Sequence, residues 1–163
     1  MPTSDPVEIL LATNHWATRN LLEACVNLTE DQFHQSFEMG PGSLHNTLTH
    51  IVGAMRGWGD LLAGREFRPR PEGEKYTPQQ LLDMLDEAAA DLENSAKSHP
   101  VDELVTRTRD GKSDTFSRGG VLTHVTTHGM HHRAQCLNML RQLGIDPLPP
   151  SAVVEWMMTD DPN

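Results

Sequence analysis

Apolar residues recur at helical spacing in four long stretches of the chain. The clearest begins at Thr77-Pro78, and its apolar residues share one helical face: Leu81, Leu82, Leu85, Ala88, Ala89 and Leu92. The other three run from residue 7 to about 28, from 44 to about 63, and from 118 to about 143. A residue that can cap a helix precedes each of these three: Ser4 or Asp5, Ser43, and Ser117. The pattern predicts four helices of about 20 residues each.

The segments between these helices contain turn and loop signals. A cap and short turn begin at Thr29, and Gly40-Pro41-Gly42 interrupts the chain. Residues 65–77 form a long loop, and residues 105–116 alternate weakly around Asp110-Gly111, which fits a small hairpin or an irregular loop. A short helix is predicted over residues 152–158. We therefore expect an all-α four-helix bundle, in a single domain over residues 1–163, with long loops that let neighbours in space differ from neighbours in sequence.

Composition excludes several classes of protein. The 163 residues carry a net charge of −10, which argues against binding to a nucleic-acid backbone. We find no run of about 20 apolar residues and no secretory signal pattern, so neither membrane insertion nor export is expected. Cys25 and Cys136 are too few for a disulfide framework, and both fall inside predicted helices. We interpret them as small core residues in a cytoplasmic protein.

Histidine is the unusual component, because four of the nine histidines fall between residues 124 and 132. At about 100° per residue, His128 and His132 overlap the apolar stripe of the last long helix, and His124 and His131 lie at its edge. Two histidines at i and i+4 can offer both imidazoles to one metal ion. The alternatives are a solvated histidine face or histidines that form hydrogen bonds inside the core.

A third ligand is expected from another helix. His50 lies at the edge of the apolar face of the helix over residues 44–63, whereas His45 is predicted to face solvent. His15 is interpreted as a partly buried core or pocket-wall residue, more suited to support a ligand than to be one. His34 and His99 fall in or beside loops and receive no role. Three imidazoles would leave a divalent metal (zinc, nickel, iron or copper) with open coordination positions, as in catalytic sites.

Three stretches of the sequence resemble the DinB/YfiT-like superfamily of metalloenzymes, also described as damage-inducible DinB proteins. The resemblance covers nearly the whole chain and rests on residues 15–33, on residues 42–58, and on residues 124–135 with their H-x-x-H-H-R-A-Q pattern. The family has glycine where this chain has Ala134. The resemblance implies a four-helix bundle whose metal is bound by His50, His128 and His132, with Arg133 and Gln135 as packing or supporting groups.

The resemblance also implies classes of function. Some members of the family transfer a low-molecular-weight thiol, so a thiol-dependent S-transferase is the first hypothesis, with His131 and His124 as candidate acid–base groups. A metal-dependent hydrolase is an alternative, and a non-catalytic metal-binding stress-response protein is another. An enzyme would need a pocket above the metal, lined by apolar side chains such as those of Trp16, Trp58 and Phe116. A sensor would have a closed coordination shell around the metal.

Two further expectations concern binding surfaces. Arg65, Arg68 and Arg70 are interpreted as a solvated loop, with anion recognition at the mouth of a site as the alternative. The family name alone suggests DNA, which the net charge opposes, and family members often form homodimers. We therefore expect a small-molecule substrate and a homodimer, with no nucleic-acid or membrane partner.

Overall fold

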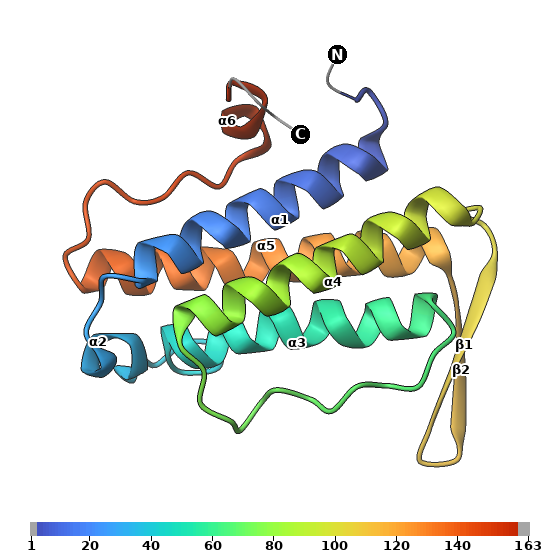
Figure 1. Cartoon of the computed structure of the whole chain (residues 1–163), viewed down its shortest axis with the longest axis horizontal. Helices are drawn as coiled ribbons and strands as arrows, with labels where there is room; N and C mark the ends of the chain where they lie inside the picture. Colours follow the sequence, from blue (N-terminus) through green and yellow to red (C-terminus); the bar gives the residue numbers. More distant parts are fainter. Residues whose placement is uncertain (1–2, 160–163) are drawn as a thin grey trace.

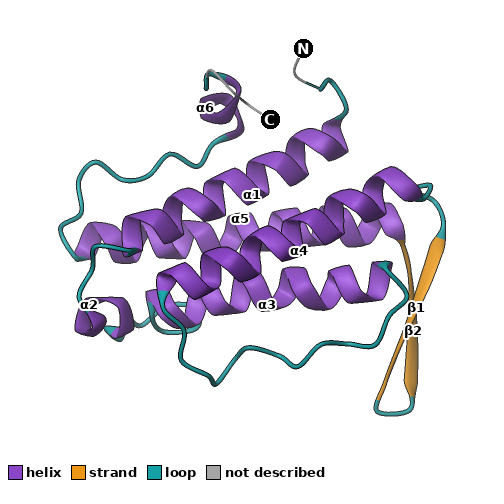
Figure 2. Ribbon diagram, viewed as in Figure 1, coloured by secondary structure: helices purple, strands orange, loops and turns teal. Residues whose placement is uncertain are grey.

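A computed structural model describes residues 3–159 and confirms the all-α fold, with six helices and one small hairpin in this part of the chain (Figure 1; Figure 2). The elements, in chain order, are α1 (Pro6–Cys25), α2 (Glu30–His34), α3 (Leu44–Leu62), α4 (Pro78–Ser98), β1 (Leu104–Arg109), β2 (Lys112–Ser117), α5 (Arg118–Gln142) and α6 (Val153–Met157). The four long helices form the bundle, and the short α6 packs against α1. No helix among the described residues is both long enough and apolar enough to cross a membrane.

Each long helix begins directly after a capping residue, three of which the sequence analysis identified. The Asp5 carboxylate accepts a hydrogen bond from the backbone N–H of Val7 at 2.7 Å, and the hydroxyls of Ser43 and Ser117 accept equivalent bonds at the starts of α3 and α5. At α4, Thr77 forms a reciprocal capping box with Gln80. These bonds satisfy backbone donors that the first helical turn leaves free.

The order of the helices around the bundle differs from their order in the chain. Helix α1 packs against α4 and α5, and α3 packs against the same two helices. In Figure 1, α1 and α5 run in one direction, and α3 and α4 run in the other. Because α3 and α4 are parallel neighbours, residues 63–77, which we call the return segment, must run back along the bundle before α4 can begin (Figure 1). This agrees with the expectation that sequence neighbours need not be antiparallel.

Residues 104–117 form a hairpin rather than an irregular loop. Val105 on β1 pairs with Phe116 on β2, and Arg109 pairs with Lys112 beside the turn. The turn residues Asp110 and Gly111 have φ values of 51° and 75°. Positive φ at both positions is the requirement of a two-residue type I′ hairpin turn, and Asp-Gly is one of the preferred pairs for it. The hairpin extends from the end of the bundle where α3 ends and α5 begins (Figure 1).

A buried guanidinium group joins α5 to α1. Arg133 is 5% exposed and donates a 2.5 Å hydrogen bond to the side-chain oxygen of Asn14. A Cβ atom on Gly129 would lie 2.2 Å from that same oxygen, so only glycine leaves room for the contact. The contact sets how α5 is rotated in the bundle, and thereby which way its remaining side chains face. Arg133 is thus a packing group, as the sequence analysis expected.

The return segment is anchored to α3 by a buried carboxylate. Asp60, whose side chain is 1% exposed, accepts hydrogen bonds from Arg65 Nε at 2.6 Å and from the backbone N–H of Arg68 at 2.9 Å. Burial alone would raise the pKa of Asp60, but these hydrogen bonds and those from the Arg68 guanidinium lower it below its usual value. The interpretation of this arginine cluster as a solvated loop is therefore wrong for Arg68, whose side chain is 19% exposed, whereas the Arg65 and Arg70 side chains are 40% and 68% exposed.

Removing the Asp60 charge should destabilise the protein strongly. Asp60→Asn would leave two arginines without their buried partner, and we expect the free energy of unfolding to fall by about 3 kcal/mol. Glu87→Gln is the matched control, because Glu87 also pairs with Arg68 but its side chain is 60% exposed, and it should cost less than about 1 kcal/mol. Urea denaturation of the three proteins measures both effects, and equal losses in the two variants would contradict the anchoring role.

Candidate metal site

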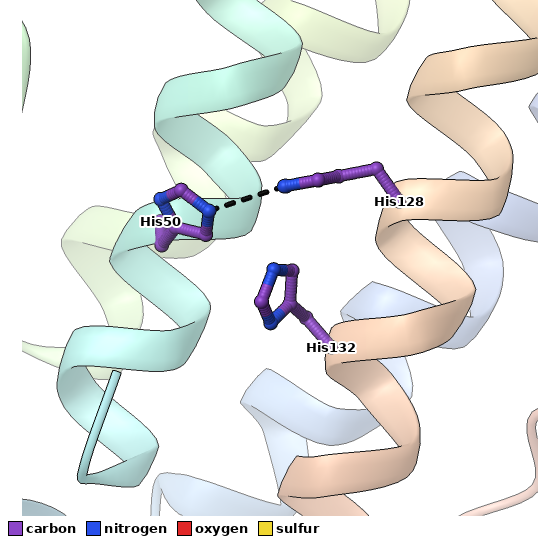
Figure 3. A group of neighbouring side chains, drawn as sticks. All are labelled: His50, His128 and His132. Carbon is purple, nitrogen blue, oxygen red and sulfur yellow. Dashed lines mark hydrogen bonds between the residues drawn. The ribbon is translucent and has the colours of Figure 1, made fainter. Parts of the chain in front are cut away.

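Three histidines from two antiparallel helices converge at the α3–α5 interface. His50 is on α3, and His128 and His132 are one turn apart on α5 (Figure 3). The Nε2 atoms of His50 and His128 lie 3.1 Å apart, and the candidate ligand atoms of all three lie within 4.8 Å of one another. All three rings are half-buried. The structure therefore brings together the three histidines that the sequence analysis selected, in a group that could hold a metal ion.

The geometry and chemistry of these donors suit a divalent transition metal. Two nitrogen ligands at about 2.0–2.1 Å from one ion lie about 2.8–3.4 Å apart for angles between octahedral and tetrahedral. The 3.1 Å separation of His50 Nε2 and His128 Nε2 falls in this range. Imidazole ligands suit zinc, nickel and iron, and three of them leave coordination positions open.

Two side chains orient the rings of the cluster. The side-chain oxygen of Gln135 lies 2.7 Å from His132 Nδ1, and a carboxylate oxygen of Glu72 lies 3.3 Å from His50 Nδ1. A proton held on Nδ1 by either acceptor leaves Nε2 of that ring free to bind a metal. Gln135 follows His132 by one helical turn and was expected to support the site. Glu72 was missed, because it comes from the return segment, and no local pattern connects it to α3.

Burial favours the neutral form of His128 and His132 by lowering the pKa of each. The pKa of His128 is lowered to about 4, first by burial and then by the neighbouring imidazoles of His132 and His50. Burial also lowers the pKa of His132, although its hydrogen bond to Gln135 acts in the opposite direction. Metal ligation requires the neutral imidazole, so His128 and His132 are in the form that a metal needs.

The remaining interior histidines belong to other contacts. His45 was predicted to face solvent, which is wrong: it is 4% exposed, and its Nε2 accepts a 3.1 Å hydrogen bond from the backbone N–H of Tyr76. The return segment covers this side of α3, which a helical wheel cannot show. His15 is partly buried as predicted, but its Nε2 lies 2.8 Å from Asp86 across the α1–α4 interface. It supports that interface rather than the histidine cluster.

The two candidate acid–base histidines flank the cluster on exposed positions of α5. The ring of His124 lies 5.6 Å from that of His128 and 5.2 Å from that of Trp58. The ring of His131 lies 4.9 Å from that of His132. His124 lines a hollow together with Trp58 and Phe116, and His131 is not part of this hollow.

A pocket of about 400 Å³ opens beside the cluster. His50 and His128 form part of its wall, with α3, the return segment and β1 providing the rest: Gly53, Ala54, Arg56, Gly57, Trp58, Phe67, Arg68, Pro69, Arg70, Pro71, Arg107, Thr108 and Arg109. Trp58 therefore lines the pocket as predicted, and Phe116 lines the adjoining hollow. Trp16, the third predicted wall residue, is on α1 and contributes to neither.

Neither cysteine can act as a nucleophile in this pocket. Cys25 and Cys136 are free thiols with no exposed surface, which confirms their interpretation as core residues. Burial raises the pKa of Cys25 to about 12 and also raises the pKa of Cys136. Both thiols therefore remain protonated and inaccessible.

The fold and the cluster define a helical-bundle protein with a possible three-histidine metal site. The model of the DinB family matches residues 1–159, and the chain belongs to this family. The match confirms the resemblance found in the sequence and agrees with a metal-associated bundle. A comparison with curated proteins finds no match.

The lowered pKa of His128 predicts how the stability of the metal-free protein depends on pH. In the unfolded chain this imidazole takes up a proton near pH 6.5, whereas in the folded protein it remains neutral until about pH 4. The unfolded state therefore binds more protons between these values, and stability falls as the pH is lowered through this window.

The test compares the wild type with His128→Gln by urea denaturation in the presence of a chelator. The wild type should lose more stability than the variant between pH 7 and pH 4.5, because glutamine does not titrate. If the free energy of unfolding depends on pH in the same way in both proteins, His128 is not the source of the pH dependence.

Proposed function

We propose that this protein is a metal-dependent enzyme in which His50, His128 and His132 bind a divalent ion, and that it transfers an external thiol to an electrophile. The observation that carries the proposal is the pocket of about 400 Å³ that reaches His50 and His128. A closed coordination shell would be expected of a protein that only senses or stores a metal. The open pocket therefore favours an enzyme over a non-catalytic stress-response protein.

The chemistry of the chain favours an external thiol as the nucleophile. A divalent ion held by the three histidines would lower the pKa of a coordinated thiol toward neutrality. Because Cys25 and Cys136 are buried and have raised pKa values, the attacking sulfur must come from a small molecule. This role fits the expected small-molecule partner and a reducing cytoplasm, in which such thiols are abundant.

His124 is the better placed of the two acid–base candidates. Its ring contacts Trp58 and lines the hollow next to the pocket, so it can take the thiol proton as the sulfur approaches. The sulfur then forms a bond to the electrophilic carbon, and the leaving group departs with the electrons of the broken bond. His131 faces the other side of the cluster and would act only on a ligand bound near His132.

The metal ligands can be tested by elemental analysis of the purified protein. The wild type should bind about one equivalent of zinc, nickel or iron. His50→Ala, His128→Ala and His132→Ala should each weaken binding at least about 100-fold, because even the loss of a group that merely orients a ligand costs about 10–100-fold. His99→Ala is the control, because this ring pairs with Glu103 at the end of α4. Full metal occupancy in all three variants would contradict the assignment of these histidines as ligands.

The reaction can be tested with monochlorobimane and a panel of cellular thiols. The metal-loaded enzyme should form the carbon–sulfur bond and release chloride, a chelator should abolish turnover, and added metal should restore it. His124→Ala should lower kcat about 100-fold while keeping its metal, as expected for a general base. No thiol-dependent turnover by the metal-loaded protein would contradict the transferase. Metal-dependent cleavage of an ester without any thiol would instead favour the hydrolase.

A further inference from the structure

The pocket beside the histidine cluster is rich in arginine although the chain as a whole is acidic. The net charge of the protein is −10, yet five arginines line this one pocket: Arg56, Arg68, Arg70, Arg107 and Arg109. Among the described residues, no aspartate or glutamate belongs to the lining. The pocket therefore concentrates positive charge in a protein that is negative elsewhere, which favours an anionic ligand.

Some of these arginines already form ion pairs with carboxylates of the protein. Arg68 pairs with Asp60 and Asp91, each at 2.9 Å, and holds the return segment in place. Arg70 and Arg109 lie at the mouth, with side chains 68% and 69% exposed and carboxylate neighbours at 3.9 and 3.7 Å. Arg68 is structural, and the two mouth residues can attract an anion but hold it only weakly.

Arg56 and Arg107 remain available to a ligand. No carboxylate within residues 3–159 lies within 4.0 Å of the Arg56 guanidinium, and the Nε atoms of Arg56 and Arg107 are buried without a hydrogen-bond partner. Arg107 has one carboxylate neighbour, Asp114 at 3.2 Å, and its guanidinium stacks over the Trp58 ring at 5.1 Å. Both residues line the pocket, and each guanidinium carries further N–H donors that an anion in the pocket can use.

The space between these arginines and the histidines is open. A Cβ atom added to Gly57 would meet no atom within 4 Å, although Gly57 lines the pocket. One turn earlier, a Cβ on Gly53 would lie 3.0 Å from Pro71, so the return segment closes the pocket there. A small molecule in this pocket can therefore contact His50 and His128 as well as Arg56 and Arg107, because all four line it.

We propose that this pocket selects small molecules that carry a carboxylate group, with Arg56 and Arg107 as its anchors and the reacting atom at the histidine cluster. The inference rests on the proposed function and names its substrate class. Guanidinium groups suit a carboxylate because their donors form parallel, charge-assisted hydrogen bonds with its two oxygens. The carboxylate can belong to the thiol or to the electrophile, and the experiment has one arm for each.

The first arm uses protein loaded with Co²⁺, in which a bound thiolate produces a charge-transfer band. We titrate 3-mercaptopropionate and its neutral amide, 3-mercaptopropionamide, into the same protein. If the carboxylate belongs to the thiol, the acid should bind about tenfold more tightly than the amide. Arg56→Met and Arg107→Met should remove this preference while the affinity for Co²⁺ and for the amide is unchanged.

The second arm needs neither a thiol nor a metal. Calorimetry of the metal-free protein compares succinate with its neutral analogue, succinamide. Succinate should bind about tenfold more tightly to the wild type, and the preference should disappear in Arg56→Met and Arg107→Met. Arg141→Met is the matched control in both arms, because Arg141 is exposed near the end of α5 and does not line the pocket. Gly57→Leu fills the open space without changing charge. It should weaken the binding of both the acid and its neutral analogue in each arm.

The outcomes separate this inference from the proposed function. A preference for the acid in the first arm assigns the carboxylate to the thiol, and a preference for succinate alone assigns it to the electrophile. Equal binding of the acid and the neutral compound in both arms would overturn the carboxylate site and leave the metal-thiol chemistry intact. If neither thiol produces a band with Co²⁺ bound but succinate is still preferred, the transferase proposal fails and the carboxylate site stands.

Discussion

The parallel packing of α3 and α4 is the constraint on which the site depends. Two adjacent helices that point the same way cannot be joined by a short turn, so the return segment must cover the length of α3, about 28 Å for 19 residues. Its path across α3 is held by the buried Asp60 carboxylate, which binds both a side chain and the backbone of the segment. The path brings Glu72 to His50, Pro71 to Gly53, and Phe67 and Arg70 to the pocket.

The other half of the site depends on how α5 is rotated. Arg133 is buried against Asn14 of α1, and the missing side chain of Gly129 leaves room for that bond. With Arg133 turned toward α1, the adjacent His132 and the preceding His128 turn toward α3. A polar contact on one face of α5 thus directs the imidazoles on another face. The same burial that orders the helix also keeps His128 unprotonated near neutral pH.

Imidazoles and guanidinium groups line one pocket. The imidazoles are held by a glutamine and a glutamate, and two arginines with unpartnered Nε atoms lie further along α3 and on β1. This combination suits a ligand that carries both a reacting atom and an anionic group. The hairpin contributes to it directly, because β1 provides Arg107, and the aromatic rings of Trp58 and Phe116 support that guanidinium.

The sequence by itself determined the four long helices, their caps and the ligand candidates, because helical periodicity and capping are local properties of the chain. His128 and His132 share a face by spacing alone, and the same helical geometry places His50 at the edge of the apolar face of its own helix. The family resemblance implied the same three ligands. Only the tertiary structure decided the contacts made by the return segment and the hairpin, which cover His45 and add Glu72 and Arg107 to the site. It also decided that Arg56 of α3 lines the pocket and that Trp16 of α1 does not. Such contacts join residues far apart in the chain, and they follow from which helices are neighbours and in which direction they run. No periodic pattern within a single helix carries that information.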